Sequence, residues 1–212
     1  MSSPNRSIRL LIVDDHFIVR MGLTSALNLE TDMQVVGEAG NGRAAIEAYR
    51  RHQPDVLLMD YQLPELNGAE ATQAIRAEFP AARVIILSVY KGEEDVHRAV
   101  RAGAMAYLPK SSEPEELLEA IRTVYAGERY FPATIARQIE GRAGREELSG
   151  REIEVLRMIV RGHSTKESAA LLGISENTVK FHTKRVFDKL GVLDRVQATT
   201  AAIERGIVHL EG

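Results

Sequence analysis

The stretch "DVLLMDYQLPELNG", residues 55 to 68, decides the fold of the first part of the chain. Its four apolar residues, VLLM at 56 to 59, form a short continuous run between turn signals. Such a run is typical of a central parallel strand that is buried on both faces. The strand ends in Asp60. A carboxylate in this place has lost part of its water, so it needs a cation, a hydrogen-bond donor or a chemical role.

Similar short apolar runs occur before and after this one, and amphipathic helical patterns separate them. The expected strands are residues 8–13, 34–39, 56–60, 83–88 and 104–108, and a last helix covers residues 114–126. Alternating strands and helices of this spacing predict an α/β fold, a five-stranded parallel doubly wound sheet with helices on both faces. Ligands bind such sheets beyond the carboxyl ends of the strands.

Polar residues follow four of these strands. Asp14 and Asp15 follow the first, Asp60 ends the third, Ser88 ends the fourth and Lys110 follows the fifth. Because the carboxyl ends of parallel strands share one edge of the sheet, we expect these five side chains to lie close together. Each alone has an ordinary explanation, such as a helix cap or a solvated lysine. Their joint placement favours a functional site.

Three carboxylates at one edge repel each other unless a cation lies among them. Oxygen ligands of this kind indicate Mg²⁺, which uses one or two carboxylates together with waters and a phosphate oxygen. A phosphoryl group on Asp60 would be held by the metal on one side and by Lys110 and Ser88 on the other. The pattern therefore predicts phosphoryl transfer to an aspartate.

Two enzyme hypotheses use the same fold. The segment "GNGRAA", residues 40 to 45, matches a dinucleotide-binding fingerprint, and Asp60 lies where a ribose-binding acid would be. That interpretation gives Asp14, Asp15 and Lys110 no role, and Asn41 and Gly42 are explained as a turn. An aspartyl-phosphate phosphatase is the other hypothesis, but its nucleophile usually follows the first strand. We expect that the protein is not an enzyme.

Residues 7–127 resemble the receiver domain of bacterial two-component response regulators, in the segments "LLIVDDH", "VLLMDYQLPELNG", "VIILSVY" and "AYLPK". The resemblance implies Asp60 as the phosphoacceptor, with a sensor histidine kinase as partner. It implies Asp14, Asp15, Asp60 and the backbone carbonyl of Gln62 as the protein ligands of Mg²⁺. Ser88 and Tyr107 would form the switch pair of the family, in which the hydroxyl moves towards the phosphoryl group and the ring turns inward.

Four serines precede helical patterns in the second half of the chain. Ser112 with Glu115, Ser149 with Glu152, and Ser164 with Glu167 have the spacing of capping boxes, while Ser175 stands before "ENTVKFHTKRVFDKL". Between residues 128 and 147 the chain mixes charge with glycine, which indicates a linker that holds a short helix. The later serines predict an all-α region with the turn "LLGIS" of a helix-turn-helix.

The helix expected after Ser175 has two different faces. At 100° for each residue, one face carries Val179, Thr183, Val186 and Leu190. Away from it lie Asn177, Lys180, Phe181, Lys184 and Arg185, and these five together with Thr178 are the DNA-contact candidates. An outward aromatic between lysines suits a thymine methyl in the major groove, and the cations suit phosphates or guanine. His182 lies at the border of the buried face and is interpreted as structural.

Residues 148–209 resemble the helix-turn-helix domain of NarL/FixJ (LuxR-type) regulators, in "LSGREIEVLRMIVRGHSTKESAALLGISENTVKFHTKRVFDKLGVLDRVQA". The resemblance implies Lys180, Phe181 and Lys184 as groove contacts and the last helix, residues 196–205, as a dimer surface. Ser168 stands where the family usually has Ile. Since its position on the helical wheel falls between Leu171 and Leu172, we expect it to face the core and to bond a backbone carbonyl.

Charge and composition fit this division. The chain has 212 residues, 44% hydrophobic residues, no cysteine and a net charge of −3. Residues 1–148 hold 17 Lys/Arg against 22 Asp/Glu, while residues 149–212 hold 10 against 8. A basic balance of only +2 predicts that DNA binding needs more than one copy. The apolar runs are too short for a membrane span, so we expect a cytoplasmic protein with no membrane partner.

The sequence therefore predicts a receiver at 7–127, a linker at 128–147 and a helix-turn-helix domain at 148–212. The expected function is a response regulator transcription factor. Mg²⁺-dependent phosphorylation of Asp60 by a histidine kinase would switch homodimerisation and binding to double-stranded DNA. The alternative keeps the DNA binding but makes the receiver inert, so that regulation is independent of phosphorylation.

Overall fold

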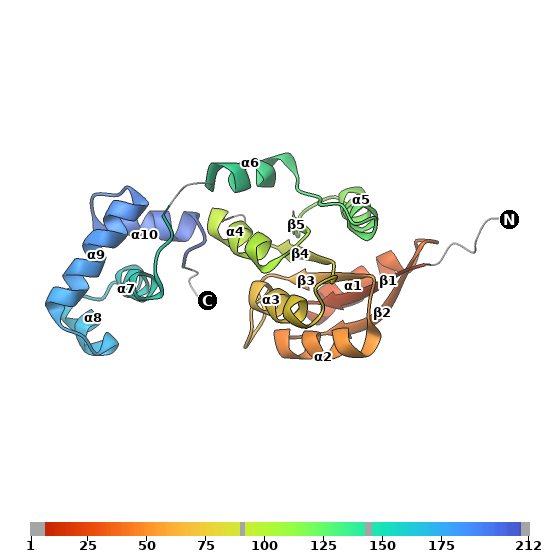
Figure 1. Cartoon of the computed structure of the whole chain (residues 1–212), viewed down its shortest axis with the longest axis horizontal. Helices are drawn as coiled ribbons and strands as arrows, with labels where there is room; N and C mark the ends of the chain where they lie inside the picture. The colour runs from red at the N-terminus through yellow and green to blue at the C-terminus, as the bar shows by residue number, and fades with distance from the viewer. Residues whose placement is uncertain (1–6, 90–91, 143–145, 209–212) are drawn as a thin grey trace. The chain divides into compact units, whose positions relative to one another are not determined.

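A computed structural model describes residues 7–89, 92–142 and 146–208 of the chain. These residues form two compact units, one built on a sheet and one made of helices (Figure 1). Residues 143–145 of the expected linker and residues 209–212 of the expected C-terminal domain lie outside the described residues. Each unit is described by itself.

The first unit contains a five-stranded parallel sheet in the order β2-β1-β3-β4-β5. Its strands are β1 (Ile8–Val13), β2 (Met33–Ala39), β3 (Val56–Asp60), β4 (Val84–Ser88) and β5 (Ala106–Pro109). The expected fold class is confirmed, and β1 and β3 have the expected bounds. β5 begins two residues later than expected and includes Pro109. All residues of β3 and β4 are buried, which explains why these strands read as continuous apolar runs.

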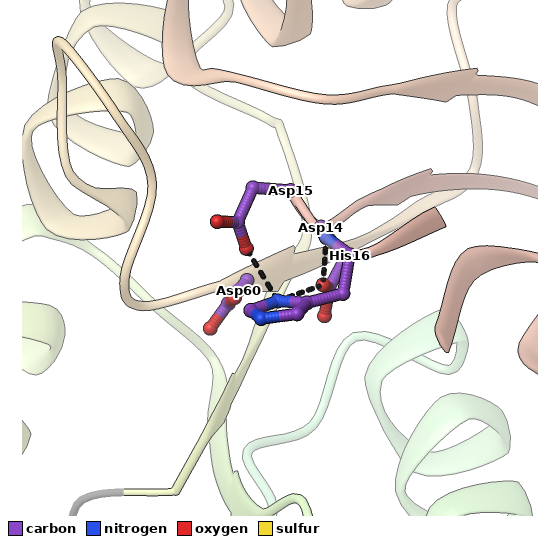
Figure 2. A group of neighbouring side chains, drawn as sticks. All are labelled: Asp14, Asp15, His16 and Asp60. Atoms are coloured by element: carbon purple, nitrogen blue, oxygen red, sulfur yellow. Dashed lines mark hydrogen bonds and ion pairs between the residues drawn. The ribbon is translucent and has the colours of Figure 1, made fainter. Parts of the chain in front are cut away.

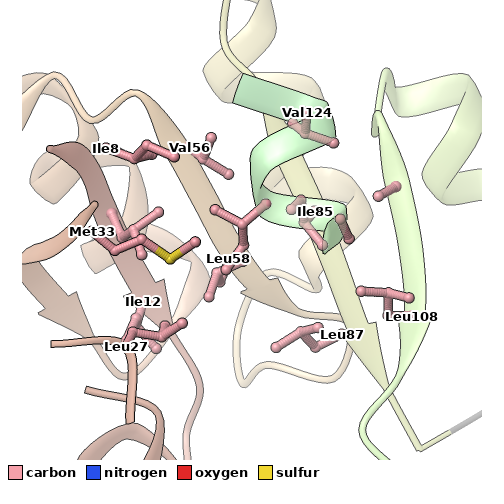
Figure 3. Packing of buried hydrophobic residues seen from close by; sticks show 14 residues of the cluster. Ile8, Ile12, Leu27, Met33, Val56, Leu58, Ile85, Leu87, Leu108 and Val124 are labelled. Atoms are coloured by element: carbon pink, nitrogen blue, oxygen red, sulfur yellow. The ribbon is translucent and has the colours of Figure 1, made fainter. Parts of the chain in front are cut away.

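Helices connect the strands. They are α1 (Phe17–Leu27), α2 (Gly42–His52), α3 (Gly68–Glu78), α4 (Glu93–Ala102) and α5 (Pro114–Tyr125). The core against one face of the sheet joins Ile12, Leu58 and Ile85 of the strands with Leu27 of α1 and Val124 of α5 (Figure 3). Packing of helices against both faces leaves only the strand ends open, so it fixes where a ligand can approach.

The start of α5 differs from the expectation. The capping box of Ser112 with Glu115 is absent, and the helix is preceded by Glu113, which makes no side-chain cap hydrogen bond. Pro114 is the reason, because a proline at the first helical position forces the preceding residue into an extended conformation. Ser112 instead donates its backbone N–H to the carbonyl of Pro109 at 2.9 Å.

The remaining helices are α6 (Ala133–Arg142), α7 (Gly150–Val160), α8 (Thr165–Leu172), α9 (Glu176–Leu190) and α10 (Arg195–Glu204). The expected linker does contain a helix, α6. Capping boxes at Ser149 and Ser164 begin α7 and α8, and the Ser175 hydroxyl accepts the N–H of Thr178 at the start of α9. Gly173 ends α8 with a φ of 65°, so glycine makes the turn between α8 and α9 possible. These caps were predicted correctly.

Candidate functional site

Two buried carboxylates lie at the carboxyl ends of β1 and β3. Asp14 directly follows β1, Asp60 ends β3, and the two strands are neighbours in which Val13 pairs with Met59. The Asp14 residue is 1% exposed and Asp60 is 3% exposed. Burial of two acids side by side is costly unless a cation compensates them. The two buried carboxylates at this edge of the sheet therefore need a nearby positive charge.

The ammonium group of Lys110 supplies this positive charge. Its backbone N–H donates to the carbonyl of Ser88 at 2.8 Å, which extends the pairing of β4 with β5 by one residue. Its ammonium donates to Oδ2 of Asp14 at 2.5 Å and to Oδ2 of Asp60 at 2.8 Å. One cation from the end of β5 thus joins the acids of β1 and β3, as the strand order predicts.

These contacts shift the acid–base properties of the site in opposing directions. Burial raises the pKa of Asp60, while the hydrogen bond and charge of Lys110 lower it less than burial raises it. Burial would lower the pKa of Lys110, but its bonds to Asp14 and Asp60 outweigh that effect and raise the pKa. Lys110 consequently stays charged, and it is the group that favours the ionised form of Asp60.

Four potential metal ligands gather beside this ion pair. Asp14, Asp15, His16 and Asp60 each offer one ligand atom, and these atoms lie within 4.8 Å of one another (Figure 2). Asp14 and Asp60 are buried, whereas Asp15 and His16 are exposed, so the cluster opens to solvent on one side. A set dominated by carboxylate oxygens is compatible with a divalent metal such as Mg²⁺.

The other candidates of the receiver lie around Asp60. The N–H of Gln62 donates to Oδ1 of Asp60 at 3.1 Å, so the loop after β3 folds back on the acid. Ser88 and Tyr107 are both fully buried, and the Tyr107 ring lies 6.2 Å from the Tyr61 ring between centroids. The Tyr107 ring is therefore in an inward position. The metal-ligand role of the Gln62 carbonyl and the switch roles of Ser88 and Tyr107 stay predictions.

The second glycine of the dinucleotide-like segment, Gly42, has a packing role. A Cβ added to Gly42 would lie 2.2 Å from the backbone oxygen of Leu66 and 2.8 Å from its Cβ. Glycine is required there because the loop between β3 and α3 touches the start of α2. The Asn41 side chain caps α2 by accepting the N–H of Ala44. The protein itself thus fills the space that a pyrophosphate would need at Gly42.

The outer face of α9 in the second unit is exposed as expected. Val179, Val186 and Leu190 are buried in the core with α7, α8 and α10. The DNA-contact candidates lie outside that core: Asn177, Lys180, Phe181, Lys184 and Arg185 are exposed, and Thr178 is partly exposed. Phe181 is 57% exposed, although an aromatic side chain gains from burial. This face is a candidate for a nucleic-acid contact.

Comparison with known proteins identifies both units. The model of the response regulator receiver domain matches residues 10–122, and the model of bacterial regulatory proteins of the luxR family matches residues 146–202. The chain belongs to the LuxR-type response regulators. Transcription factors of this family are not enzymes, so that expectation is confirmed.

Relatives that align over nearly their whole length support the assignment of this chain to the LuxR-type response regulators. The uncharacterized transcriptional regulatory protein YxjL of Bacillus subtilis is 39% identical over 95% of this chain and 98% of its own length. The response regulator protein VraR of Staphylococcus aureus is 33% identical over 96% of this chain and all of its own length. Both alignments therefore span the receiver and the LuxR-type domain of this regulator.

Solved structures give the same result. The response regulator ChrA of a heme-sensing two-component system aligns with a TM-score of 0.56 and 38% identity, over 95% of this regulator and 99% of ChrA. The response regulator RcsB in a complex with DNA aligns with a TM-score of 0.67 and 25% identity, over 92% of this regulator and 98% of RcsB. Among the described residues of the regulator, no helix has the length and apolar character needed to span a membrane.

Sequence reasoning did not include His16 in the site of this response regulator. Its Nδ1 lies 2.7 Å from Oδ1 of Asp15 and 3.3 Å from Oδ1 of Asp14, and the backbone N–H of His16 donates to Oδ1 of Asp14 at 2.9 Å. The signal was present in "DDH", because histidine is a common metal ligand. Since the side chain is 69% exposed, its direction depends on a rotamer that no sequence pattern fixes.

Two expectations about the regulator's second unit have opposite outcomes. Ser168 is 1% exposed and its hydroxyl donates to the carbonyl of Ser164 at 2.8 Å, so the expected back-bond is confirmed. Leu171 is 62% exposed, so its use as a marker of the buried face was wrong. The partly exposed His182 places its ring 5.4 Å from that of Phe181 between centroids.

Proposed function

We propose that this response regulator accepts a phosphoryl group on Asp60 from a sensor histidine kinase. The observation that carries the proposal is the ammonium of Lys110 bonded to both Asp14 and Asp60 at the carboxyl edge of the sheet. A structural ion pair needs one acid for one lysine, whereas here two buried carboxylates share Lys110 and Asp15 adds a third carboxylate to the same cluster. A phosphoryl site with a metal uses all of these groups.

In this proposal, Asp14, Asp15, Asp60 and the carbonyl of Gln62 hold Mg²⁺. The ion, when bound, supplies positive charge that offsets the charge of the phosphoryl oxygens. One carboxylate oxygen of Asp60 attacks phosphorus, a P–O bond forms, and the bond from phosphorus to the donor breaks. Lys110 moves its hydrogen bond from the Asp60 carboxylate to a phosphoryl oxygen, which its flexible stem permits. The Ser88 hydroxyl donates to another phosphoryl oxygen.

Oxygen Oδ1 of Asp60 is restrained by the N–H of Gln62, whereas Oδ2 is bonded to Lys110. The two oxygens are therefore distinguished before any phosphoryl group arrives. The burial that raises the pKa of Asp60 favours the protonated acid, which is a poor nucleophile. Lys110 opposes this effect, so it prepares the nucleophile as well as receiving the product's charge.

The proposal continues in the second unit. Asn177, Thr178, Lys180, Phe181, Lys184 and Arg185 of α9 would enter the major groove of double-stranded DNA. Phosphorylation would move Ser88 and Tyr107 and favour a homodimer through α10, whose Val196 is 75% exposed. Two recognition helices would then reach adjacent half-sites. We propose domain bounds of 7–127, 128–147 and 148–212, and a cytoplasmic location because the target is DNA.

The test is the intact mass of the chain after incubation with Mg²⁺ and a small acyl-phosphate donor. We expect one added phosphate in the wild type, none in Asp60→Asn, and none in the wild type when a chelator removes Mg²⁺. DNA affinity is then measured with and without the phosphate. A folded wild type that takes no phosphate, yet binds DNA, would support the alternative of a regulator with an inert receiver.

A further inference from the structure

A buried carboxylate in α7 contacts two cations of the recognition helix α9. Glu152 is 1% exposed, and its Oε2 accepts the N–H of Ser149 at 2.7 Å and the ammonium of Lys189 at 2.9 Å. Its Oε1 lies 3.7 Å from Nε of Arg185. Lys189 also donates to the carbonyl of Glu147. The two oxygens of Glu152 therefore differ in function: one is used by the helix cap and Lys189, and the other faces Arg185.

Arg185 connects this carboxylate to the exposed face of α9. Its guanidinium carbon lies 5.6 Å from the centroid of the Phe181 ring, one helical turn earlier. Both side chains are more than half exposed. Within the described part of the chain, Arg185 makes no hydrogen bond, so its terminal nitrogens are available. The result is a planar cation beside an aromatic ring, with Nε facing the Glu152 carboxylate in an ion pair and the outer edge open.

We propose that Arg185 and Phe181 together read one base step, a guanine next to a thymine, and that Glu152 is the positioning residue that orients the guanidinium. The proposal rests on the proposed DNA binding of α9 and names what that helix recognises. A guanidinium fork matches the O6 and N7 acceptors of guanine, and an apolar ring matches the C5 methyl of thymine. Because the two side chains touch each other, the two bases they reach are neighbours.

A phosphate contact is the competing role for Arg185, and its surroundings argue against it. Glu152 offsets part of the charge that a phosphate would attract, whereas Lys180 and Lys184 form no ion pair with any described residue. The two lysines are therefore better phosphate contacts. An arginine with one edge facing a carboxylate and the other edge open is better suited to bidentate recognition, in which orientation matters more than net charge.

The experiment uses the full chain, incubated with Mg²⁺ and a small acyl-phosphate donor, to select duplexes from a random-sequence DNA library. The wild type is compared with Arg185→Lys and Glu152→Gln. Lysine keeps the charge but loses the fork, so we expect the preference for guanine at the step to fall about tenfold. The dependence of affinity on salt should change little, because the number of cations is the same.

Glu152→Gln tests the positioning role. Glutamine can still cap the helix at this position, but it removes the charge that orients Arg185. Glu167→Gln is the matched control, because Glu167 occupies the same capping-box position in α8, is exposed and forms no ion pair with a described lysine or arginine. Both variants change the net charge by the same amount. We expect a weaker guanine preference in Glu152→Gln and an unchanged motif in Glu167→Gln.

Phe181→Leu provides a separate readout for the thymine, whose preference should fall while the guanine preference remains. A wild-type motif without adjacent thymine and guanine would overturn the inference. An unchanged motif in Arg185→Lys would overturn it as well, and this variant is exposed enough to fold even where Glu152→Gln does not. Selection of no sequence at all by the wild type would overturn the proposed DNA binding, and the inference with it.

Discussion

At the scale of single residues, the ion-pair clusters around Asp60 and around Glu152 have the same arrangement. Each places a buried carboxylate between two elements and satisfies it with a lysine from elsewhere in the chain: Asp60 with Lys110, and Glu152 with Lys189. Removing one partner of such a pair is costly, because the remaining charge stays buried. The clusters differ in the groups that lie beside the buried carboxylate. Asp60 lies beside potential metal ligands, whereas Glu152 lies beside Arg185.

Lys110→Met should destabilise the receiver and make it more dependent on Mg²⁺. The substitution leaves Asp14 and Asp60 buried without their cation, which we expect to cost about 3 kcal/mol of unfolding free energy. A bound divalent ion would restore positive charge, so Mg²⁺ should raise the melting temperature more in this variant than in the wild type. Arg50→Met is the control, because its pair with Glu78 is on the surface and far weaker. Equal Mg²⁺ effects in both variants would contradict the metal site.

From the contacts of Glu152 we expect the stability of the second unit to depend on pH. Burial would raise its pKa, but hydrogen bonds from Lys189 and from the N–H and hydroxyl of Ser149 outweigh burial and hold the pKa below its usual value. A carboxylate with a lowered pKa in the folded state stabilises that state above the unfolded pKa of about 4.3. The stabilisation is lost as pH falls through the lower folded pKa.

Wild type and Glu152→Gln should therefore differ by about 2 kcal/mol at pH 7, the scale of hydrogen bonds to a charged group. Chemical unfolding at a series of pH values measures the difference, which should decrease below pH 4.3 and disappear once the carboxylate is protonated in both states. Glu167→Gln at its exposed position serves as the control. A difference that stays constant down to low pH would show that packing, and not charge, makes Glu152 stabilising.

At the scale of elements, the positions of strands and helices are best predicted where a local sequence rule determines them. Continuous apolar runs locate β3 and β4, and Ser149, Ser164 and Ser175 locate the starts of three helices. Pro114 was visible, yet the box expected at Ser112 ignored its effect on the preceding residue. Two kinds of feature could not be predicted from local sequence. One is a tertiary contact, such as that of Glu152 with a lysine 37 residues later, and the other is the rotamer of an exposed side chain such as His16.

Ser168→Ile should stabilise the unit that contains α8. The Ser168 hydroxyl is buried and bonds back to the carbonyl of Ser164, a type of hydrogen bond that contributes little to helix stability. An apolar side chain at this position would bury more hydrocarbon, and we expect a gain of about 1 kcal/mol. Thermal unfolding of the full chain measures it. Leu171→Ile on the exposed side of α8 should have almost no effect, and a lowered melting temperature in Ser168→Ile would mean that the site has no room.

At the scale of the whole molecule, DNA affinity depends on the number of copies that bind together. Residues 149–212 carry 10 Lys/Arg against 8 Asp/Glu, a net charge of +2, and Glu152 already engages two of the cations of α9. Few phosphates can be neutralised by one such domain, so one copy should bind weakly and a pair should bind with roughly twice the dependence on salt. The proposed dimer through α10 is what would convert phosphorylation of Asp60 into affinity.

Val196→Asp tests this link, because Val196 lies on α10 with 75% of its surface exposed. A charge there should prevent two copies of α10 from packing, while the receiver and the outer face of α9 stay intact. We expect normal phosphate uptake, unchanged affinity for DNA with one half-site, and at least tenfold weaker affinity for DNA with two half-sites, measured on the phosphorylated full chain. Leu29→Asp, equally charged and at an exposed position of the receiver, is the matched control. Should both variants bind the two-site DNA as the wild type does, pairing would have to use another surface, and the phosphorylated receiver would be the next place to substitute.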